Sequence, residues 1–517
     1  MSWLVPFPIL VPFLGAGISL IFGGKLLAQR IIAVGALAIT LCVAVVLFVA
    51  VDQGPIVAEV AGWAPPIGIA LVVDRLSALM LVISVSVTLA VLVYSTAQRV
   101  DQTGEGAPVS VFHPTFLILS AGVSNAFLAG DLFNLYVGFE ILLFASFVLI
   151  TLGGTRERMR SGTIYVVVSL VSSLIFLVAL AMAYGATGTV NMAHLGVRLP
   201  LIDGGTQLTI HLMLLIAFGI KAAVFPLSSW LPDSYPTAPA PVTAVFAGLL
   251  TKVGVYAIIR TEVLLFPGGS LSTLLLVVAA FTMVIGILGA VAQDDIKRML
   301  SFTLVSHIGF MIWGIGLSTN AGLGAAIFYV THHITVQTAL FLVAGIMEYI
   351  SGTTSLTRLG SLLKLSPLLA VLYLIPAFNL SGIPPMTGFL GKAGLIEASA
   401  DQGSPLAWTL VAAGLVTSFL TLYAMTRAWN MAFWQEAEHE PTMQPLPRAM
   451  VGSSAALIAL SLALAVGAGP LMQYTQRAAL DLRARSPYIS AVLPAGEIPD
   501  EIYHDPFEAE AESGVTN

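Results

Sequence analysis

The sequence predicts an all-α polytopic membrane protein of about fourteen transmembrane helices, with two inverted five-helix repeats and two discontinuous helices. Only 9% of the 517 residues are charged, whereas soluble domains carry about 25%, and the mean hydropathy is +0.95. Hydrophobic stretches recur with short gaps from Leu4 to Met472. Such stretches must be helical, because lipid offers no partners to open backbone groups. Proline-rich breaks interrupt two of them.

Fourteen hydrophobic segments are long enough to span a bilayer, since a transmembrane helix needs about 20 mostly apolar residues. The predicted spans lie near 3–23, 30–51, 76–96, 112–130, 131–152, 161–184, 208–226, 238–262, 271–292, 299–317, 321–347, 366–384, 405–430 and 450–472. The predicted organisation is a three-helix segment (1–111), a first repeat of spans four to eight (112–262), a second repeat of spans nine to thirteen (263–434), a last helix (435–474) and a polar acidic tail (475–517).

Lysine and arginine are distributed unevenly between the two sets of loops. The loops after odd-numbered spans hold Lys25, Arg30, Arg99, Arg156, Arg158, Arg160, Lys297, Arg298, Arg358, Lys364, Arg427 and Arg448. The loops after even-numbered spans hold only Arg75, Arg198 and Arg260. By the positive-inside rule, we predict a multi-pass protein of the cell membrane with both termini on the outer side.

Four charged residues lie far from the ends of their spans. Glu140 follows Asp131 by nine residues, which is about 14 Å along a helix and therefore mid-bilayer depth. Lys221, Lys252 and Lys392 also lie within or beside hydrophobic segments. Each charge costs at least about 2.5–3.5 kcal/mol at the centre of a bilayer, so each is expected to have a partner or a function.

Two interpretations of these charges are open. Glu140 and Lys221 could form an inert ion pair that holds helices together, but buried pairs seldom add net stability over apolar packing. Three central lysines also face a single central glutamate, so at least two of them lack a carboxylate of their own. An ammonium group without a partner in a low-dielectric interior releases its proton readily. This property suits a proton carrier, and we favour that interpretation.

Two proline-rich breaks lie next to two of these lysines, the first directly after Lys221 in span seven and the second directly before Lys392, between spans twelve and thirteen. The stretch PLSSWLPDSYPTAPAP runs from Pro226 to Pro241, and Pro384 and Pro385 form the second break. Proline removes backbone donors and frees carbonyl groups inside the bundle. Interrupted helices in corresponding positions of two halves indicate a transport site and an inverted repeat. We therefore pair spans four to eight with spans nine to thirteen, although either break alone could be an ordinary loop or kink.

Three histidines lie between the lysines. His332 and His333 lie in span eleven with Gln337 nearby, and His307 lies in span ten. Imidazole titrates near neutral pH and can relay protons in either direction. Adjacent residues point to different helix faces, so one of His332 and His333 is expected to line a path. The alternatives are a satisfied hydrogen-bonding role and zinc or haem ligation. Because no cysteine or carboxylate lies at ligand spacing, no metal site and no cofactor is predicted.

The composition disfavours other classes of function. The net charge of -6 comes mostly from an acidic tail, so no nucleic-acid binding is predicted. The single cysteine, Cys42, excludes disulfide bonds within the chain. The sequence contains no phosphate-binding loop, no dinucleotide-binding fingerprint and no soluble domain for a redox centre. We therefore predict a transporter component rather than an enzyme, driven by an ion gradient or by a partner subunit.

Glu140, Lys221, Lys252, His307 and Lys392 lie in four segments that carry a family resemblance. The chain resembles the antiporter-like family that includes the proton-pumping membrane subunits of respiratory complex I and the large subunits of Mrp-type multisubunit cation/proton antiporters. The resemblance extends from about Gly122 to Glu397, and the segment around Glu140, like ATGTVNMAHL, is closer to the Mrp branch. The four segments are DLFNLYVGFEILLFASFVLITLGGTRER, IKAAVFPLSSWLPDSYPTAPAPVTAVFAGLLTKVGVYAIIRT, QDDIKRMLSFTLVSHIGF and SGIPPMTGFLGK.

The resemblance implies fourteen helices with inverted five-helix repeats and a role for each buried charge. Glu140 and Lys221 would be a coupled acid–lysine pair. Lys252 would be the central relay lysine and Lys392 the terminal ionisable residue, with the histidines of span eleven between them. Some relatives carry a lysine where this chain has Gln337, and a water-bridged glutamine could keep the path hydrated there.

Three functions are consistent with these residues. The first is a proton-translocating subunit of a multisubunit cation (Na+)/proton antiporter, with sister subunits of A, B, C, E, F and G type as partners and membrane lipid around it. The second is a proton-pumping subunit of a redox pump of the complex I or membrane-bound hydrogenase type. The third is a scaffold subunit whose buried charges are relics, which predicts that removal of Glu140 or Lys221 leaves transport intact.

Overall fold

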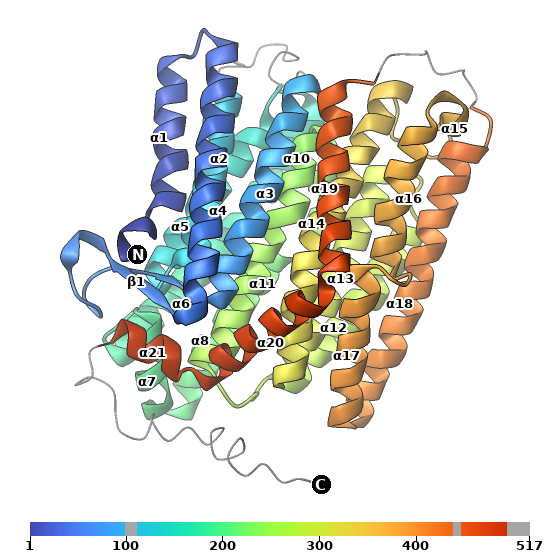
Figure 1. The fold of residues 1–517 in the computed structure, drawn as a ribbon. Coiled ribbons are helices and arrows are strands. Elements are labelled where there is room, and N and C mark those ends of the chain that lie inside the picture. Colours follow the sequence, from blue (N-terminus) through green and yellow to red (C-terminus); the bar gives the residue numbers. More distant parts are fainter. Residues whose placement is uncertain (99–110, 438–445, 494–517) are drawn as a thin grey trace.

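Long helices that run roughly parallel to one another make up most of the protein (Figure 1). The computed structural model describes residues 1–98, 111–437 and 446–493. The helices of the first half are α1 (Phe7–Ile21), α2 (Leu26–Ala50), α3 (Arg75–Gln98), α4 (Phe112–Leu128), α5 (Leu132–Thr151), α6 (Arg156–Thr187), α7 (Met192–Arg198), α8 (Gly204–Ala222), α9 (Trp230–Ser234), α10 (Ala240–Val245) and α11 (Thr251–Arg260). Those of the second half are α12 (Ser272–Val291), α13 (Ile296–Gly316), α14 (Asn320–Ser351), α15 (Leu362–Leu365), α16 (Pro367–Ser381), α17 (Thr387–Gln402), α18 (Pro405–Trp429), α19 (Arg448–Val466), α20 (Ala468–Ala484) and α21 (Ser486–Val492). Strands β1 (Ile56–Glu59) and β2 (Ala70–Val73) form an antiparallel hairpin in which Ile56 pairs with Val73.

Each predicted span coincides with a helical segment, and α17 lies between the predicted spans 366–384 and 405–430. Within the described residues, twelve helices are long and apolar enough to cross a membrane. Two shorter apolar helices, α4 and α16, occupy the predicted spans 112–130 and 366–384. The prediction of an all-α polytopic membrane protein is thereby confirmed. The inverted five-helix repeats and the boundaries between them stay predictions.

Side-chain caps determine where several of these helices begin. Asp131, between α4 and α5, accepts a 2.6 Å hydrogen bond from the backbone N–H of Asn134. Asp295 and Thr319 cap α13 and α14 in the same way. Such caps satisfy amide groups that have no partner within the first helical turn. Consecutive helices can therefore reverse direction through the very short connections that the sequence predicts.

Helix α14 lies inside the bundle. It packs against α3, α10, α13, α16, α17, α19 and α20, and its side chains from Gly322 to Met347 are all buried. A helix enclosed by other helices can carry polar side chains that would be costly against lipid. The two adjacent histidines and Gln337 lie on this helix.

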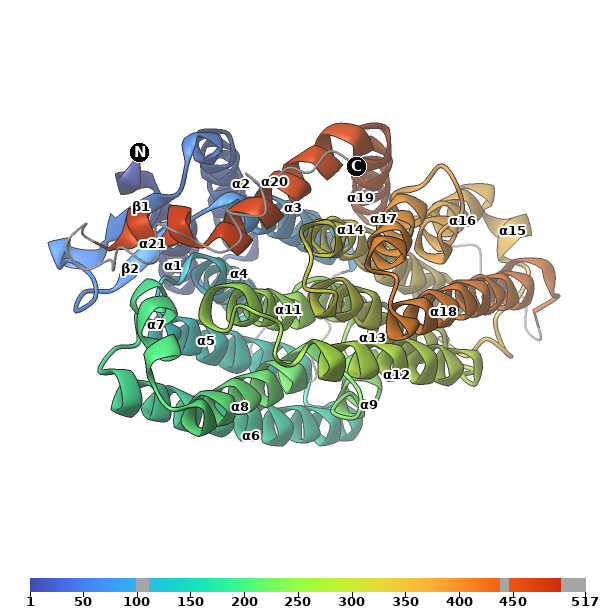
Figure 2. The same cartoon turned by 90° about the horizontal axis from the view of Figure 1, so that it is seen from below.

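The lower face in Figure 1 carries elements that lie beside the spans. The β hairpin, α7, α20 and α21 gather there, and Figure 2 shows α20 and α21 running across this face. The sequence predicts a last helix to residue 474 followed by a polar tail. The structure differs: α19 ends at Val466, and two further helices extend to Val492. Residues 494–517, with the acidic end of the tail, lie outside the described residues.

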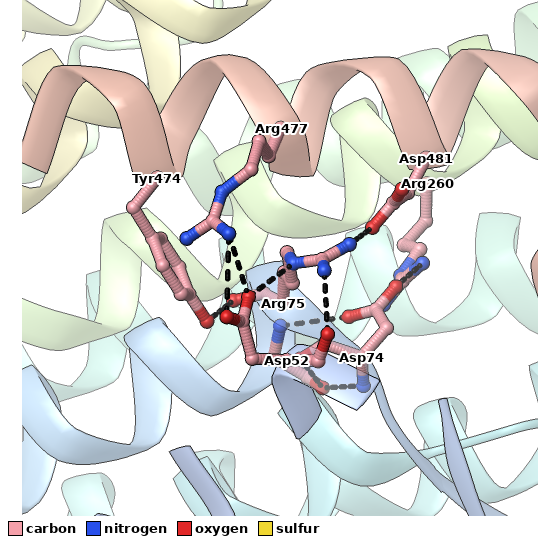
Figure 3. Close-up of polar contacts among 8 residues, drawn as sticks. Asp52, Asp74, Arg75, Arg260, Tyr474, Arg477 and Asp481 are labelled. Carbon is pink, nitrogen blue, oxygen red and sulfur yellow. Dashed lines mark hydrogen bonds and ion pairs between the residues drawn. The ribbon is translucent and has the colours of Figure 1, made fainter. Parts of the chain in front are cut away.

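An ionic network fastens α20 to the ends of α2 and α3 (Figure 3). Arg75 pairs with Asp52 at 3.1 Å and also with Asp481 of α20. Arg477 of α20 pairs with Asp52 at 3.1 Å. The hydroxyl of Tyr474 donates a 3.0 Å hydrogen bond to the carbonyl oxygen of Arg75. Segments more than 390 residues apart in the sequence are therefore joined at the lower face.

Arg260 is a buried residue within a helix. The sequence had suggested that it lies in a loop after an even-numbered span. It lies in the last turn of α11, it is 3% exposed, and its guanidinium lies 2.6 Å from a carboxylate oxygen of Asp74. Burial tends to raise the pKa of Asp74, but the charge of Arg260 and hydrogen bonds from Arg260 and Ser77 lower that pKa below its usual value. Three arginines were predicted for the loops after even-numbered spans. Without Arg260, only Arg75 and Arg198 keep that assignment.

Candidate functional site

Lys221 lies in the last turn of α8, next to the first helix break. Helix α8 ends at Ala222, and Ala223 adopts a left-handed backbone conformation with φ 59°. Nζ of Lys221 lies 3.4 Å from the carbonyl oxygen of Ser169 on α6. It also lies 5.7 Å from the centre of the Phe139 ring on α5. A backbone carbonyl and an aromatic ring therefore hold this ammonium group.

Glu140 lies close to Lys221 but does not touch it. The glutamate is half-buried on α5, and its Oε1 is buried without a hydrogen-bond partner among the protein groups. Its charge acts on Lys221, yet the two side chains form no ion pair. The inert ion pair considered for these residues is therefore absent from the structure. The two groups are therefore near enough to influence each other without being in contact.

A small cavity lies beside the Lys221 side chain. Its volume is about 20 Å³, and Tyr165, Trp230, Tyr235 and Leu250 line it together with the lysine. A polar cavity of roughly this size accommodates about one water molecule. The cavity therefore offers a place where a proton can leave or reach the lysine.

Lys252 lies in the first turn of α11, directly after a π-helical turn (Phe246–Leu250). The lysine is 0% exposed, and its Nζ donates a 2.6 Å hydrogen bond to the carbonyl oxygen of Ala247. Single π-helical turns within helices occur frequently at functional sites. Here the π-helical turn provides the oxygen that holds the lysine.

The three histidines lie where α13, α14 and α17 meet. Nδ1 of His307 on α13 is 2.7 Å from the hydroxyl of Tyr329. The ring of His333 on α14 lies 5.4 Å from the ring of His307, centre to centre. Nδ1 of His332 is 2.8 Å from the hydroxyl of Thr387 at the start of α17. The adjacent histidines thus contact different helices, as their spacing predicts, and His332 and His307 both meet hydroxyl groups.

Lys392 lies on α17, just after the second helix break. Its Nζ donates hydrogen bonds of 3.1 and 3.0 Å to the carbonyl oxygens of Leu380 and Ser381, at the end of α16. Its Nζ also lies 5.0 Å from the centre of the Phe310 ring. Gly382 ends α16 with φ 88°, and a Cβ atom there would lie 3.1 Å from Nζ. The lysine therefore meets the carbonyl end of a half-helix, where the helix dipole favours a cation.

The four prolines of the predicted site mark the two breaks. Pro226 lies in the turn after α8, and Pro241 lies in the first turn of α10. Pro384 and Pro385 connect α16 to α17. The side-chain oxygen of Asn379 accepts a 2.9 Å hydrogen bond from the backbone of α17 across this second break. The breaks thus end one half-helix and begin another, and they expose the carbonyl groups that Lys392 uses.

The structure brings five of the predicted residues together in one group. The charge of Lys252 acts on His307 and His333, and that of Lys392 acts on these two and on His332. Gln337, predicted as a supporting residue, lies one turn beyond His333, and its Nε2 donates to a backbone carbonyl of α13 at 2.8 Å. The group extends from α11 through α13 and α14 to α17.

Glu140 and Lys221 form a second group that is separate from the first. Lys221 and Lys252 make no direct contact. Their helices nevertheless pack closely, since a Cβ atom at Gly254 of α11 would lie 2.6 Å from the backbone nitrogen of Ala222. The two groups are therefore carried on two helices that touch each other.

Several groups at the site were not identified from the sequence. Ser169, Tyr329 and Thr387 each contact a predicted residue. Hydroxyl residues in apolar helices often bond to their own backbone, so their presence alone does not indicate a site. Tyr329 could have been found, because it lies four residues before His333 on the same helix. A buried pair of His211 and Glu262 was missed as well.

The arrangement is suited to proton exchange. Amines, imidazoles and hydroxyls both donate and accept protons, and they follow one another across the middle of the bundle. Within residues 1–98, 111–437 and 446–493, no three His, Cys, Asp or Glu side chains lie together as a metal centre would require.

Comparisons with known proteins identify relatives over almost the full length of the chain. The family model described as NADH:quinone oxidoreductase/Mrp antiporter, TM, matches residues 129–421. The D-type subunit of the Na(+)/H(+) antiporter of Alkalihalophilus pseudofirmus is 40% identical over 498 residues, which cover 95% of this chain and 100% of the relative.

Solved structures show the same similarity. A chain of the Mrp complex from Dietzia sp. DQ12-45-1b superposes with a TM-score of 0.89 and 32% identity, covering 96% of this chain and 100% of that chain. A chain of respiratory complex I from Thermus thermophilus superposes with a TM-score of 0.79 and 25% identity, covering 92% of this chain and 99% of that chain. Matches of this extent in sequence and in structure show that the chain belongs to the NADH:quinone oxidoreductase/Mrp antiporter family of membrane proteins.

Proposed function

We propose that the chain is the D-type, proton-translocating subunit of a multisubunit Na+/H+ antiporter. The observation that carries this proposal is the buried group from Lys252 to Lys392, none of whose described members forms an ion pair with a carboxylate. Amines and imidazoles in a low-dielectric interior gain and lose protons when charges nearby move. Sodium/proton antiport is the activity named for the bacterial relatives that match along their whole length.

In the first half, Glu140 and Lys221 act as a coupled pair. When the carboxylate approaches, the ammonium form of Lys221 is stabilised. When the carboxylate moves away, the low dielectric favours the neutral amine, and the proton leaves. The cavity beside Lys221, whose lining includes Tyr165, Ser169 and Tyr235, provides room for a water molecule that takes this proton.

In the second half, the proton passes between Lys252 and Lys392 by way of the histidines. A neutral imidazole accepts a proton on one ring nitrogen and releases another from the opposite nitrogen. The hydroxyls of Tyr329 and Thr387 orient His307 and His332 for this exchange. The carbonyl end of α16 stabilises the ammonium form of Lys392 at the end of the row.

The subunit works within an assembly in the cell membrane, with A-, B-, C-, E-, F- and G-type subunits as partners. Both termini lie on the outer side, so the lower face in Figure 1 is the outer face. The excess of lysine and arginine in the loops of the opposite face supports this orientation. The chain transfers protons and is not itself an enzyme.

A redox-driven proton pump is the second candidate. The superposition on a complex I chain with a TM-score of 0.79 favours it. The same row of residues would serve, and only the source of energy would differ.

A sodium-jump experiment on inverted vesicles that contain the whole complex tests the proposal. The wild type is compared with Lys221→Ala at equal assembly, and Lys364→Ala is the control, because that lysine side chain is 75% exposed. We expect a sodium-triggered pH change in the wild type and the control and none in Lys221→Ala. A normal response of Lys221→Ala contradicts the role of Lys221. A wild type that ignores sodium favours the redox pump.

A further inference from the structure

A second buried polar pair joins the same two helical segments that carry Lys221 and Lys252. Nε2 of His211 on α8 lies 2.6 Å from Oε1 of Glu262, which lies in the π-helical turn (Thr261–Leu265) that continues α11. The two side chains are 2% and 6% exposed. The His211 ring stacks on the ring of Phe266, with 4.1 Å between centres. Such a pair is costly to bury and adds little stability over apolar packing.

The pair lies between the lysines and the lower face of the protein. Ten residues separate His211 from Lys221, and ten separate Glu262 from Lys252. Each separation corresponds to about 15 Å along a helix. Helices α8 and α11 pack against each other, and both reach toward the lower face (Figure 1). Lys221 and Lys252 therefore form one layer of titratable groups on α8 and α11. The His211–Glu262 pair forms a second layer, nearer to the lower face.

A cavity of about 160 Å³ reaches Glu262 from the lower face. The exposed loop at Gly268, the α13–α14 connection at Ser318, and Arg483 of α20 line it. Arg483 donates to the carbonyl oxygen of Ser318 and so joins α20 to this wall. Ser318, Thr319 and Arg483 supply polar groups to a lining that also contains apolar residues, and a cavity of this volume has room for several water molecules. Because Glu262 is one of the lining residues, water in the cavity would lie beside this side chain.

We propose that Glu262 and His211 form a proton-exchange site through which the path at Lys221 and Lys252 opens to the outer face. A proton from cavity water adds to the Glu262 carboxylate or, through it, to the imidazole of His211. When the proton is released, it passes back from these groups to cavity water. No other reactant is needed. A carboxylate and an imidazole in direct contact are the side chains best suited to proton transfer near neutral pH. This inference rests on the function proposed above.

Other charged or titratable groups lie on the elements packed against the pair. They include Arg260 on α11, His194 and Arg198 on α7, Arg477, Asp481 and Arg483 on α20, and Tyr184 on α6. Arg260 is paired with Asp74, and Arg198 donates a 2.7 Å hydrogen bond to the carbonyl oxygen of Thr187. The variants that test the proposal leave all of these groups unchanged, so a change in pH dependence reports on the pair.

The first test compares Glu262→Gln with the wild-type complex in vesicles. The initial rate of sodium-driven proton movement is first measured at several pH values of the outer face, with the pH at the inner face held constant. It is then measured at several pH values of the inner face, with the pH at the outer face held constant. Removal of a proton-transfer group is expected to lower the rate by about tenfold or more. The residual rate should no longer depend on the pH at the outer face. It should still depend on the pH at the inner face. Glu59→Gln, an exposed change in the hairpin on the same face, is the control.

The second test leaves the pair intact, so it also decides the matter if Glu262→Gln fails to assemble. Val263 lines the cavity beside Glu262 and is replaced by cysteine in a Cys42→Ala background, which removes the single native cysteine. A membrane-impermeant thiosulfonate reagent should inhibit transport from the outer face and not from the inner face.

Two outcomes would overturn the proposal. One is wild-type rate and pH dependence in Glu262→Gln, and the other is transport that is indifferent to the reagent at Val263→Cys. In either case a loss of transport in Lys221→Ala would leave the proposed function standing. Failure of the wild type to respond to sodium would instead contradict the proposed function.

Discussion

The ammonium group of Lys252 donates a 2.6 Å hydrogen bond to the carbonyl oxygen of Ala247, inside the π-helical turn that precedes α11. This carbonyl is neutral, so it positions the ammonium group but does not cancel its charge. A lysine held in this way can lose its proton without breaking an ion pair. The contact with Ala247 therefore leaves Lys252 able to exchange its proton.

Replacement of Lys252 by arginine is expected to stop proton movement. The guanidinium group keeps the positive charge but is not deprotonated in proteins, so it cannot release a proton. Sodium-triggered pH change in vesicles should fall by about tenfold or more. Lys364→Arg, at an exposed position, is the matched control. Wild-type transport by Lys252→Arg would mean that the lysine acts only as a fixed charge.

Glu140→Gln is expected to abolish transport while the complex assembles normally. The amide keeps the size of the side chain and removes the charge that acts on Lys221. Vesicle flux and the recovery of sister subunits on purification are the two measurements. Glu157→Gln, exposed at the start of α6, should behave as the wild type. Full transport with poor assembly would support the scaffold alternative instead.

His333→Phe separates packing from proton transfer on α14. The phenyl ring can keep the ring contacts with His307 and Tyr329, but it has no nitrogen to bind a proton. We expect normal assembly with a flux about tenfold or more below that of the wild type. Tyr329→Phe, which removes only the hydroxyl next to His307, should cause a smaller loss. Equal flux in His333→Phe and the wild type would exclude His333 from the path.

Asp74→Asn is expected to destabilise the protein without a specific effect on transport per assembled complex. It leaves the guanidinium of Arg260 buried without a carboxylate, which costs about 3–5 kcal/mol. The double variant Asp74→Asn with Arg260→Met should recover most of this loss. Thermal midpoints in detergent measure both effects. Equal midpoints for Asp74→Asn and the wild type at pH 7 would contradict the prediction.

The loss of stability in Asp74→Asn should depend on pH. The pKa of Asp74 in the wild type determines the direction of this dependence. Because the pKa of this carboxyl is lowered in the folded protein, its contribution is present above its ordinary value of about 4. The contribution is lost as the pH falls through the lowered pKa. The difference in thermal midpoint between the wild type and Asp74→Asn should therefore be full at pH 7 and shrink in acid. A difference that grows in acid would contradict this assignment.

Much of the fold could be predicted because the signals are local. The length of a hydrophobic stretch identifies a membrane span without any knowledge of the neighbouring helices. The predicted segments therefore coincide with helices of the structure. Prolines end helices through their own geometry, and the breaks at Pro226 and at Pro384 lie where they were expected. The prediction differed from the structure after Gln473, where a polar sequence suggested a tail. Helix α20 continues there; it buries Tyr474, Ala479 and Leu482, and its charged face pairs with Arg75 and Asp52.

The sequence by itself predicted charged and imidazole groups at mid-membrane depth beside two broken helices. Depth follows from counting residues along a helix, and this count needs no knowledge of neighbours. Only the tertiary structure decided what each group meets: a carbonyl of a π-helical turn for Lys252, the end of a half-helix for Lys392, and Glu262 for His211. Side-chain contacts of this kind depend on how helices pack and rotate. Packing is set by the whole bundle, so no single segment of the sequence contains it.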